Sequence, residues 1–167
     1  GNDYVDNEPM PVTTWYNETF SAYIITASEM SGAKTLDGIS FWKEVRGGGS
    51  SNSVANLQTV KIAHTSDSIF PSGTLNPTGA TASAMSTSNI LTLTDEISVF
   101  SGTYTISNPS SAWTSKLNFT TDFEYNGTDN LVITWINHDG FYDFDRFDFG
   151  VQTGGNSSNR MIYKGSD

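Results

Sequence analysis

Short segments rich in β-branched and aromatic residues recur along the chain, and turn-forming residues separate them. From Leu117 to Phe123, alternate positions are largely apolar and the positions between them are polar. This alternation predicts a strand with one face on a core and the other in water. The same pattern predicts nine strands in all: Thr19–Thr26, Leu36–Lys43, Leu57–His64, Ile90–Leu93, Ile97–Ile106, Ala112–Phe123, Asn130–Asn137, Phe144–Gln152 and Arg160–Lys164.

One predicted strand differs because it is apolar at odd and even positions alike, from Leu131 to Ile136. A strand that is covered on both faces has this pattern, so we expect it to lie in the middle of a sheet. Two connections look irregular: residues 46–53 hold three consecutive glycines, and residues 66–89 form a stretch without periodicity that we expect to be a long surface loop. Asn126-Gly127 and Asn137–Gly140 have the residues of tight hairpin turns.

These elements predict an all-β fold, an antiparallel β-sandwich of the jelly-roll type, with few helices. The 167 residues suit one domain over residues 15–167. Residues 1–14 are polar and contain two prolines, and we expect them to form an extended N-terminal arm.

The composition and net charge of the chain disfavour several classes of function. The net charge of −10 disfavours nucleic acid and anionic membrane surfaces, and no apolar run approaches the length that crosses a bilayer. Cysteine is absent, which excludes disulfides and thiolate chemistry. The abundance of Ser, Thr, Asn, Gly and aromatic residues, and a first residue that is Gly1 rather than Met, favour a processed, extracellular chain.

Two segments carry a resemblance to a known group of proteins. The stretch from Phe123 to Ile133, with Trp113 before it, resembles a β-sandwich module that recurs in secreted and surface proteins of Bacteroidota, and residues 36–41 and 60–65 are similar to its earlier strands. The resemblance implies a sandwich fold and an extracellular location. It implies adhesive or carbohydrate-contacting roles, and no fixed catalytic set.

Residues 141–149 form the densest aromatic and acidic cluster, and Asp143 and Asp145 share one face of a regular strand. They are candidate calcium ligands if a bulge turns Asp148 toward them, or if Asp139 and a neighbouring loop complete the site. The alternative is a solvated acidic face on which Arg146 pairs locally. The EF-hand pattern is excluded, and we expect no other cofactor. His64 and His138 lie far apart in a sequence without a known catalytic motif, so we expect no enzyme, unless one of them meets a carboxylate in a cleft.

Four sequons begin at Asn17, Asn118, Asn126 and Asn156, a number that the high Ser and Thr content produces by chance. Each could carry a glycan if the producing cell makes them. The four tryptophans could stack on sugar rings, although aromatic residues also fill the core of a cysteine-free sandwich.

The arm offers apolar side chains at Tyr4, Val5, Met10 and Val12. Pro9 and Pro11 remove two backbone donors from the same edge, so an extended arm could join a sheet along its other edge only. The sequence therefore suggests a structural subunit that binds copies of itself head to tail through the arm, forming a filament. The alternatives are an arm that pairs within its own domain, and a carbohydrate-binding adhesive module that uses exposed aromatics and the loop of residues 66–89.

Overall fold

The structure, a computed structural model, describes residues 16–45, 53–71, 81–106, 112–113, 116–140, 147–149 and 159–166. For residues 42–45, 53, 112–113 and 147–149 it describes the backbone alone. All the strand pairs among these residues are antiparallel. None of the helices among them exceeds three residues. The predicted all-β, sandwich-like fold is confirmed.

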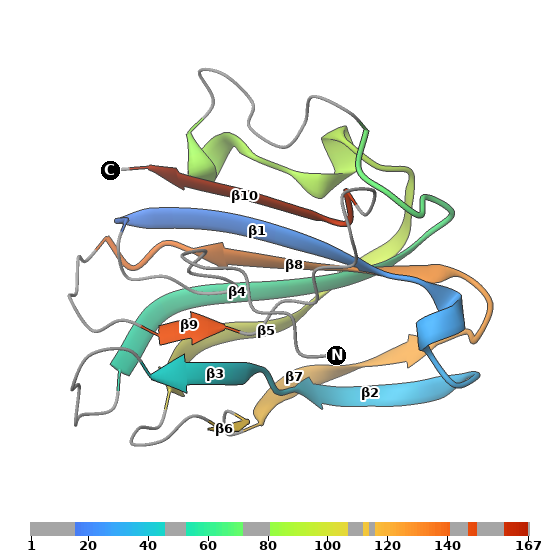
Figure 1. Cartoon of the computed structure of the whole chain (residues 1–167), viewed down its shortest axis with the longest axis horizontal. Coiled ribbons are helices and arrows are strands. Elements are labelled where there is room, and N and C mark those ends of the chain that lie inside the picture. The colour runs from blue at the N-terminus through green and yellow to red at the C-terminus, as the bar shows by residue number, and fades with distance from the viewer. Residues whose placement is uncertain are drawn as a thin grey trace.

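Five strands form the main sheet, in the order β10-β1-β8-β4-β5 (Figure 1). Antiparallel pairing places β1 between β8 and β10, and β8 between β1 and β4. The strands are β1 (Glu18–Ile25), β4 (Ser53–Thr65), β5 (Leu93–Ile106), β8 (Asn130–Asn137) and β10 (Met161–Ser166).

Two smaller groups of strands form the second layer. β2 (Lys34–Ile39) pairs with β7 (Leu117–Tyr125), and β3 (Trp42–Val45) lies between β6 (Ala112–Trp113) and β9 (Phe147–Phe149). Since β3 follows β2 and β6 precedes β7, the same two chain segments stay paired along their length. The predicted strands Leu36–Lys43 and Ala112–Phe123 are thus each divided in two. The Thr120 hydroxyl on β7 donates to the Val99 carbonyl of β5 at 3.1 Å, which links the two layers.

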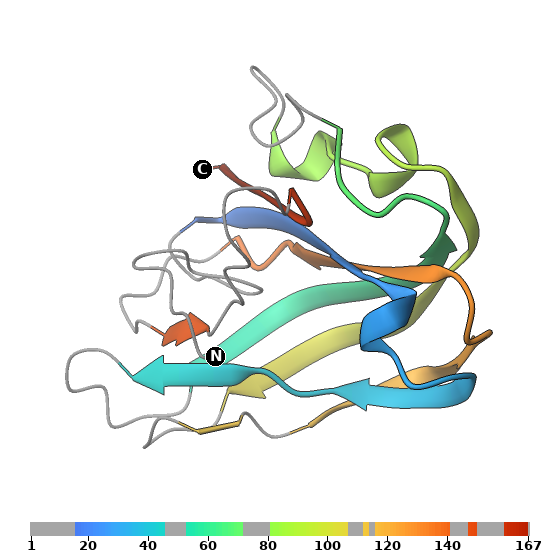
Figure 2. The same ribbon diagram turned by 45° about the vertical axis from the view of Figure 1, so that its right-hand side comes forward.

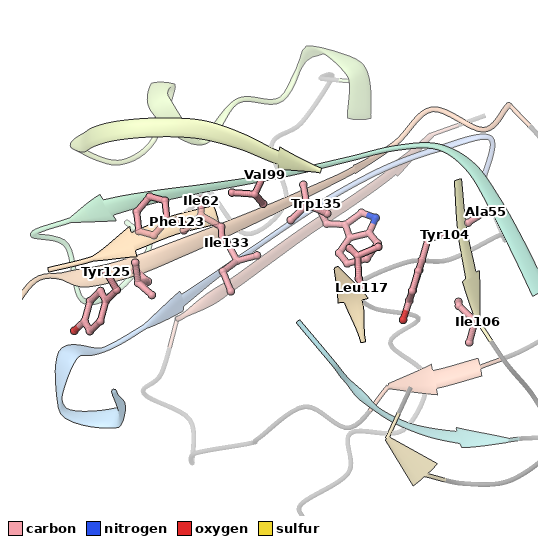
Figure 3. Close-up of a cluster of buried hydrophobic side chains, with 12 residues drawn as sticks. Ala55, Ile62, Val99, Tyr104, Ile106, Leu117, Phe123, Tyr125, Ile133 and Trp135 are labelled. Carbon is pink, nitrogen blue, oxygen red and sulfur yellow. The ribbon is translucent and has the colours of Figure 1, made fainter. Parts of the chain in front are cut away.

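β8 is the central strand, as the sequence predicts, and residues 131 to 135 are all buried. Leu131, Ile133 and Trp135 point into a core that β4, β5 and β7 complete, and Figure 3 shows Ile133 and Trp135 among its side chains. Val132 points to the opposite face, where it packs with Phe20, Ala22 and Ile24 of β1. The sheet therefore needs cover on both sides.

The cover on the second face comes from the segment that we predicted to be a surface loop. Phe70 and Ala82 of this segment are buried against this face, together with Leu91 just after it, so the prediction is wrong for the described parts of the segment. Two short 3-10 turns, η2 (Ala82–Ala84) and η3 (Thr87–Asn89), lie on one side of the sheet, and β2 and β3 lie on the other (Figure 2).

Polar side chains hold this segment in place. The Asp67 carboxylate accepts a hydrogen bond from the Thr92 backbone N–H at 2.8 Å, and the buried hydroxyls of Thr87 and Thr134 lie 3.0 Å apart. The predicted strand Ile90–Leu93 is wrong, because the backbone N–H groups of Ile90 and Leu91 both bond to the Thr87 carbonyl in a turn. β5 begins only at Leu93.

The two predicted hairpin turns are corners instead, because the strands on either side of each belong to different sheets. Residues 126–129 lead from β7 to β8. Gly127 has φ +83°, and an added Cβ would lie 2.4 Å from the Ala33 nitrogen, whereas Asn126 does not have a positive φ. After β8, the N–H groups of His138 and Gly140 bond to the carbonyls of Leu57 and Asn17, and the chain then crosses to β9.

The buried loop segment gives a test. We expect Phe70→Ala to lower the free energy of unfolding by about 3–5 kcal/mol, because it opens a cavity on the second face of the sheet. Ile69→Ala is the control, since Ile69 is 48% exposed and its truncation should change stability by less than about 0.5 kcal/mol. Denaturant unfolding followed by tryptophan fluorescence measures both. Equal, small effects would mean that the segment does not cover the sheet.

Candidate functional site

The most unusual surface feature of the described chain is a bulge in β4. Ala55 lies opposite Tyr104 and Gln58 opposite Gly102, so Asn56 and Leu57 together face the single residue Thr103 of β5. Leu57 has φ +49° in this bulge. An L-residue with a bulky side chain rarely adopts this conformation, which costs about 1–2 kcal/mol.

The bulge leaves apolar side chains in solvent. Leu57 is 64% exposed, and Val54 on the same strand is 48% exposed. A glycine or asparagine at position 57 would form the same bulge with less strain and without an exposed leucine. The stability of the isolated chain therefore does not explain why leucine stands here.

Hydrogen bonds from three sides fix the bulge. The Asn56 N–H donates to the Asp139 carboxylate at 3.0 Å, and the Thr103 hydroxyl donates to the Asn56 side-chain oxygen at 3.1 Å. The Leu57 carbonyl accepts from the His138 N–H at 3.2 Å. A strained conformation persists only where the surroundings determine it in this way.

Beneath the bulge lies a buried amide network formed by Gln58, Asn137 and Trp135. The Trp135 indole N–H donates to the Gln58 side-chain oxygen at 2.7 Å. The Gln58 amide nitrogen donates to Asn137 Oδ1 and to the Asn56 carbonyl. Asn137 Oδ1 also accepts from the Asp139 N–H, so the network joins the core to both chain segments of the bulge.

His64, considered above as a catalytic candidate, does meet a carboxylate. Its Nδ1 lies 2.8 Å from a carboxylate oxygen of Asp95, whose side chain is 56% exposed. Its Nε2 accepts a hydrogen bond from the Asn126 N–H at 3.0 Å. Because Nε2 accepts, the proton of the neutral ring is on Nδ1 and points to Asp95. Both ring nitrogens are therefore engaged, and the buried ring packs against Phe123 and Tyr125 as a link between the two layers.

The described sequon asparagines lie in three different settings. Asn118 is exposed on β7, and Asn17 is half-buried just before β1. Asn126 is exposed, but its side chain is bonded within its own turn: Oδ1 accepts from the N–H groups of Thr128 and Asp129, and Nδ2 donates to the Asp129 carboxylate. Nδ2 is the atom to which a glycan is attached, so a glycan there would compete with the turn. Asn156 lies outside the described residues.

The remaining predicted site residues lie outside the described part of the chain: Tyr4, Val5, Met10 and Val12 of the arm, and the calcium candidates Asp143 and Asp145. No group of three or more His, Cys, Asp or Glu side chains that could hold a metal occurs within the described ranges. Asp139 bonds to the bulge instead, and His138 is exposed.

Of the four tryptophans proposed as a stacking platform, Trp135 is completely buried and belongs to the core. The backbones of Trp42 and Trp113 are paired across β3 and β6, and Trp15 precedes the described residues. The bulge and its amide network were not predicted, because residues 54–58 carry no glycine or other signal that separates a bulge from a regular strand.

The His64 link gives a second test. We expect His64→Leu to lower the free energy of unfolding by about 1–3 kcal/mol, because it leaves the Asn126 N–H without an acceptor. Asp95→Asn keeps a side-chain oxygen beside the ring at an exposed position, so its effect should be much smaller. Chemical denaturation of both variants measures the difference. If His64→Leu unfolds like the unsubstituted chain, the ring does not support the corner of residues 126–129.

Comparisons with known proteins give no further assignment: no family model, no curated protein and no solved structure matches this chain. In the described part of the chain, the helices are too short and too polar to span a membrane. The resemblance to secreted Bacteroidota modules and the extracellular location stay predictions from the sequence.

Proposed function

We propose that this chain is a non-enzymatic, extracellular structural subunit that polymerises head to tail into a filament through its N-terminal arm. The observation that carries the proposal is Leu57, which is both strained and exposed in a bulge held from three sides. Residues that cost the free subunit stability, yet stay fixed, are typical of contact surfaces. A partner that buries Leu57 supplies the stabilisation that the isolated fold lacks.

The sheet topology supports this proposal. Among the described strands of the main sheet, β10 and β5 are the outermost. The first described residue, Tyr16, packs its ring on Gly165 of β10, where an added Cβ would lie 2.4 Å from the ring. Tyr16, which follows the arm in the sequence, is therefore held beside β10.

Head-to-tail growth needs two different surfaces on each subunit, one donating and one accepting. In the proposed filament, the arm donates Tyr4, Val5, Met10 and Val12, and an acceptor surface that includes Val54 and Leu57 lies on the next subunit. Subunits with a charge of −10 repel one another, so apolar and backbone contacts have to drive the association.

The engaged nitrogens of His64 support a non-enzymatic role for that residue, since neither is free to move a substrate proton. The alternative adhesive module loses one of its supports, because the described parts of the 66–89 segment pack against the sheet.

Removal of the arm tests the proposal directly. We expect deletion of residues 1–11 to abolish polymers and leave a folded monomer, as measured by light scattering and electron microscopy. A full-length variant with Ser at Tyr4, Val5, Met10 and Val12 separates side-chain contacts from chain length and should also stay monomeric. The proposal fails if the intact chain remains monomeric at high concentration, or if the deletion leaves the particle size unchanged.

The acceptor surface has its own test. We expect Leu57→Asn to weaken association about tenfold, which corresponds to roughly 1.4 kcal/mol of lost apolar burial, while the monomer unfolds at an equal or higher denaturant concentration. Ile69→Asn is the matched control, because Ile69 is also exposed but lies away from the bulge. Analytical ultracentrifugation over a concentration series gives both constants. Equal effects of the two substitutions would remove Leu57 from the contact.

A further inference from the structure

The corner between β7 and β8 contains Asn126-Gly127, the one Asn-Gly pair of the sequence. Gly127 has φ +83°, and an added Cβ would lie 2.4 Å from the Ala33 nitrogen, so another residue would be strained there. Asn126 accepts hydrogen bonds with Oδ1 and donates with Nδ2 to the Asp129 carboxylate at 2.7 Å. An ionised aspartate in place of Asn126 could not donate, so the fold of this corner uses both residues of the pair.

The exposed residue Asn126 has its side chain folded back along its own peptide bond. Its Oδ1 accepts from the Thr128 N–H at 2.9 Å and from the Asp129 N–H at 3.0 Å. A bond from Oδ1 to the N–H two residues later mimics a backbone turn, and it brings Cγ beside the nitrogen of the residue between them. That nitrogen belongs to Gly127, which has no side chain to shield it.

This arrangement favours attack of the Gly127 nitrogen on Cγ of Asn126. Negative charge would develop on Oδ1 in that reaction, and the N–H groups of Thr128 and Asp129 already donate to this atom. Holding the two reacting groups together in one turn removes much of the entropy cost that a flexible chain meets. The Asp129 carboxylate fixes the orientation of the amide, because it accepts from Nδ2.

We propose that Asn126 is a self-modifying site, at which the folded chain releases the amide nitrogen of its own side chain as ammonia. Hydroxide removes the Gly127 N–H proton, and the Gly127 nitrogen forms a bond to Cγ of Asn126. The Cγ–Nδ2 bond then breaks, and Nδ2 takes a proton from water and leaves as ammonia, which regenerates hydroxide. Water opens the resulting cyclic imide at one of its two carbonyls, giving aspartate or isoaspartate.

The modification loosens the junction between the two layers. Both products remove the Nδ2 donor and add a negative charge beside the Asp129 carboxylate, so an attraction is replaced by a repulsion. Isoaspartate also adds a methylene group to the backbone next to the Asn126 N–H, which donates to the buried His64 ring. This inference does not depend on filament formation.

The test incubates the full chain at mildly alkaline pH and follows each asparagine by mass spectrometry of proteolytic fragments. We expect Asn126 to convert about tenfold faster in the folded chain than in the chain unfolded in guanidinium chloride, because unfolding keeps the Asn-Gly sequence and removes the turn. Asn118 is the internal control. It is also exposed, but it lies on strand β7 before Phe119 and should keep its amide.

Asn126→Asp measures the structural consequence, since it makes one of the two products directly. This variant should unfold at a lower denaturant concentration than the unsubstituted chain, whereas Asn118→Asp, with the same change of charge, should alter stability little. The inference is overturned if Asn126 converts no faster in the folded chain than in the unfolded one, or if Asn118 converts at the same rate. Equal unfolding of the two aspartate variants overturns the loosening of the corner.

Discussion

The whole fold depends on the need of β8 to be covered on both faces. Its side chains are apolar at consecutive positions, so one face of the sheet alone cannot hide them. The second layer covers Leu131, Ile133 and Trp135, and the segment around Phe70, Ala82 and Leu91 covers Val132. A connection without regular strands thus becomes part of the core, which explains why buried Thr87 and the Asp67 carboxylate fasten it.

The same sheet contains buried polar groups, and their need for partners shapes its surface. Gln58 uses its amide oxygen for Trp135 and its nitrogen for Asn137 and the Asn56 carbonyl. Because leaving any of these groups unpaired in the interior is costly, the backbone of the bulge is fixed relative to the core. Leu57 is exposed as a consequence of bonds that form below it, and relaxation of its φ angle would break them.

Strands that depend on a local residue pattern are predicted well from the sequence. Features that depend on which segments pair or pack together are not. The runs of β-branched and aromatic residues locate β1 and β8 closely, and the alternation from Leu117 to Phe123 lies within β7. The loss of alternation in β8 identifies it as central, since this too is a property of one strand. The turns at Asn126 and Asn137 were located but assigned to hairpins, because a turn has the same chemistry whether the chain pairs with itself or crosses to another sheet. The segment of residues 66–89 lacks periodicity, and in its described parts irregular backbone rather than a strand buries Phe70 and Ala82.

The functional features were less accessible to sequence reasoning for a related reason. Leu57 is not unusual as a residue in a strand and becomes so only because a bulge exposes it. The register places Asn137 between the bulge and β1, opposite Gln58 on one side and Thr19 on the other. Asn137 accepts hydrogen bonds from the Gln58 amide and from the Asp139 N–H, so it holds the two chain segments of the bulge together. A substitution of Asn137 would therefore disturb the buried network and the bulge together, whereas the exposed Leu57 side chain takes no part in these bonds.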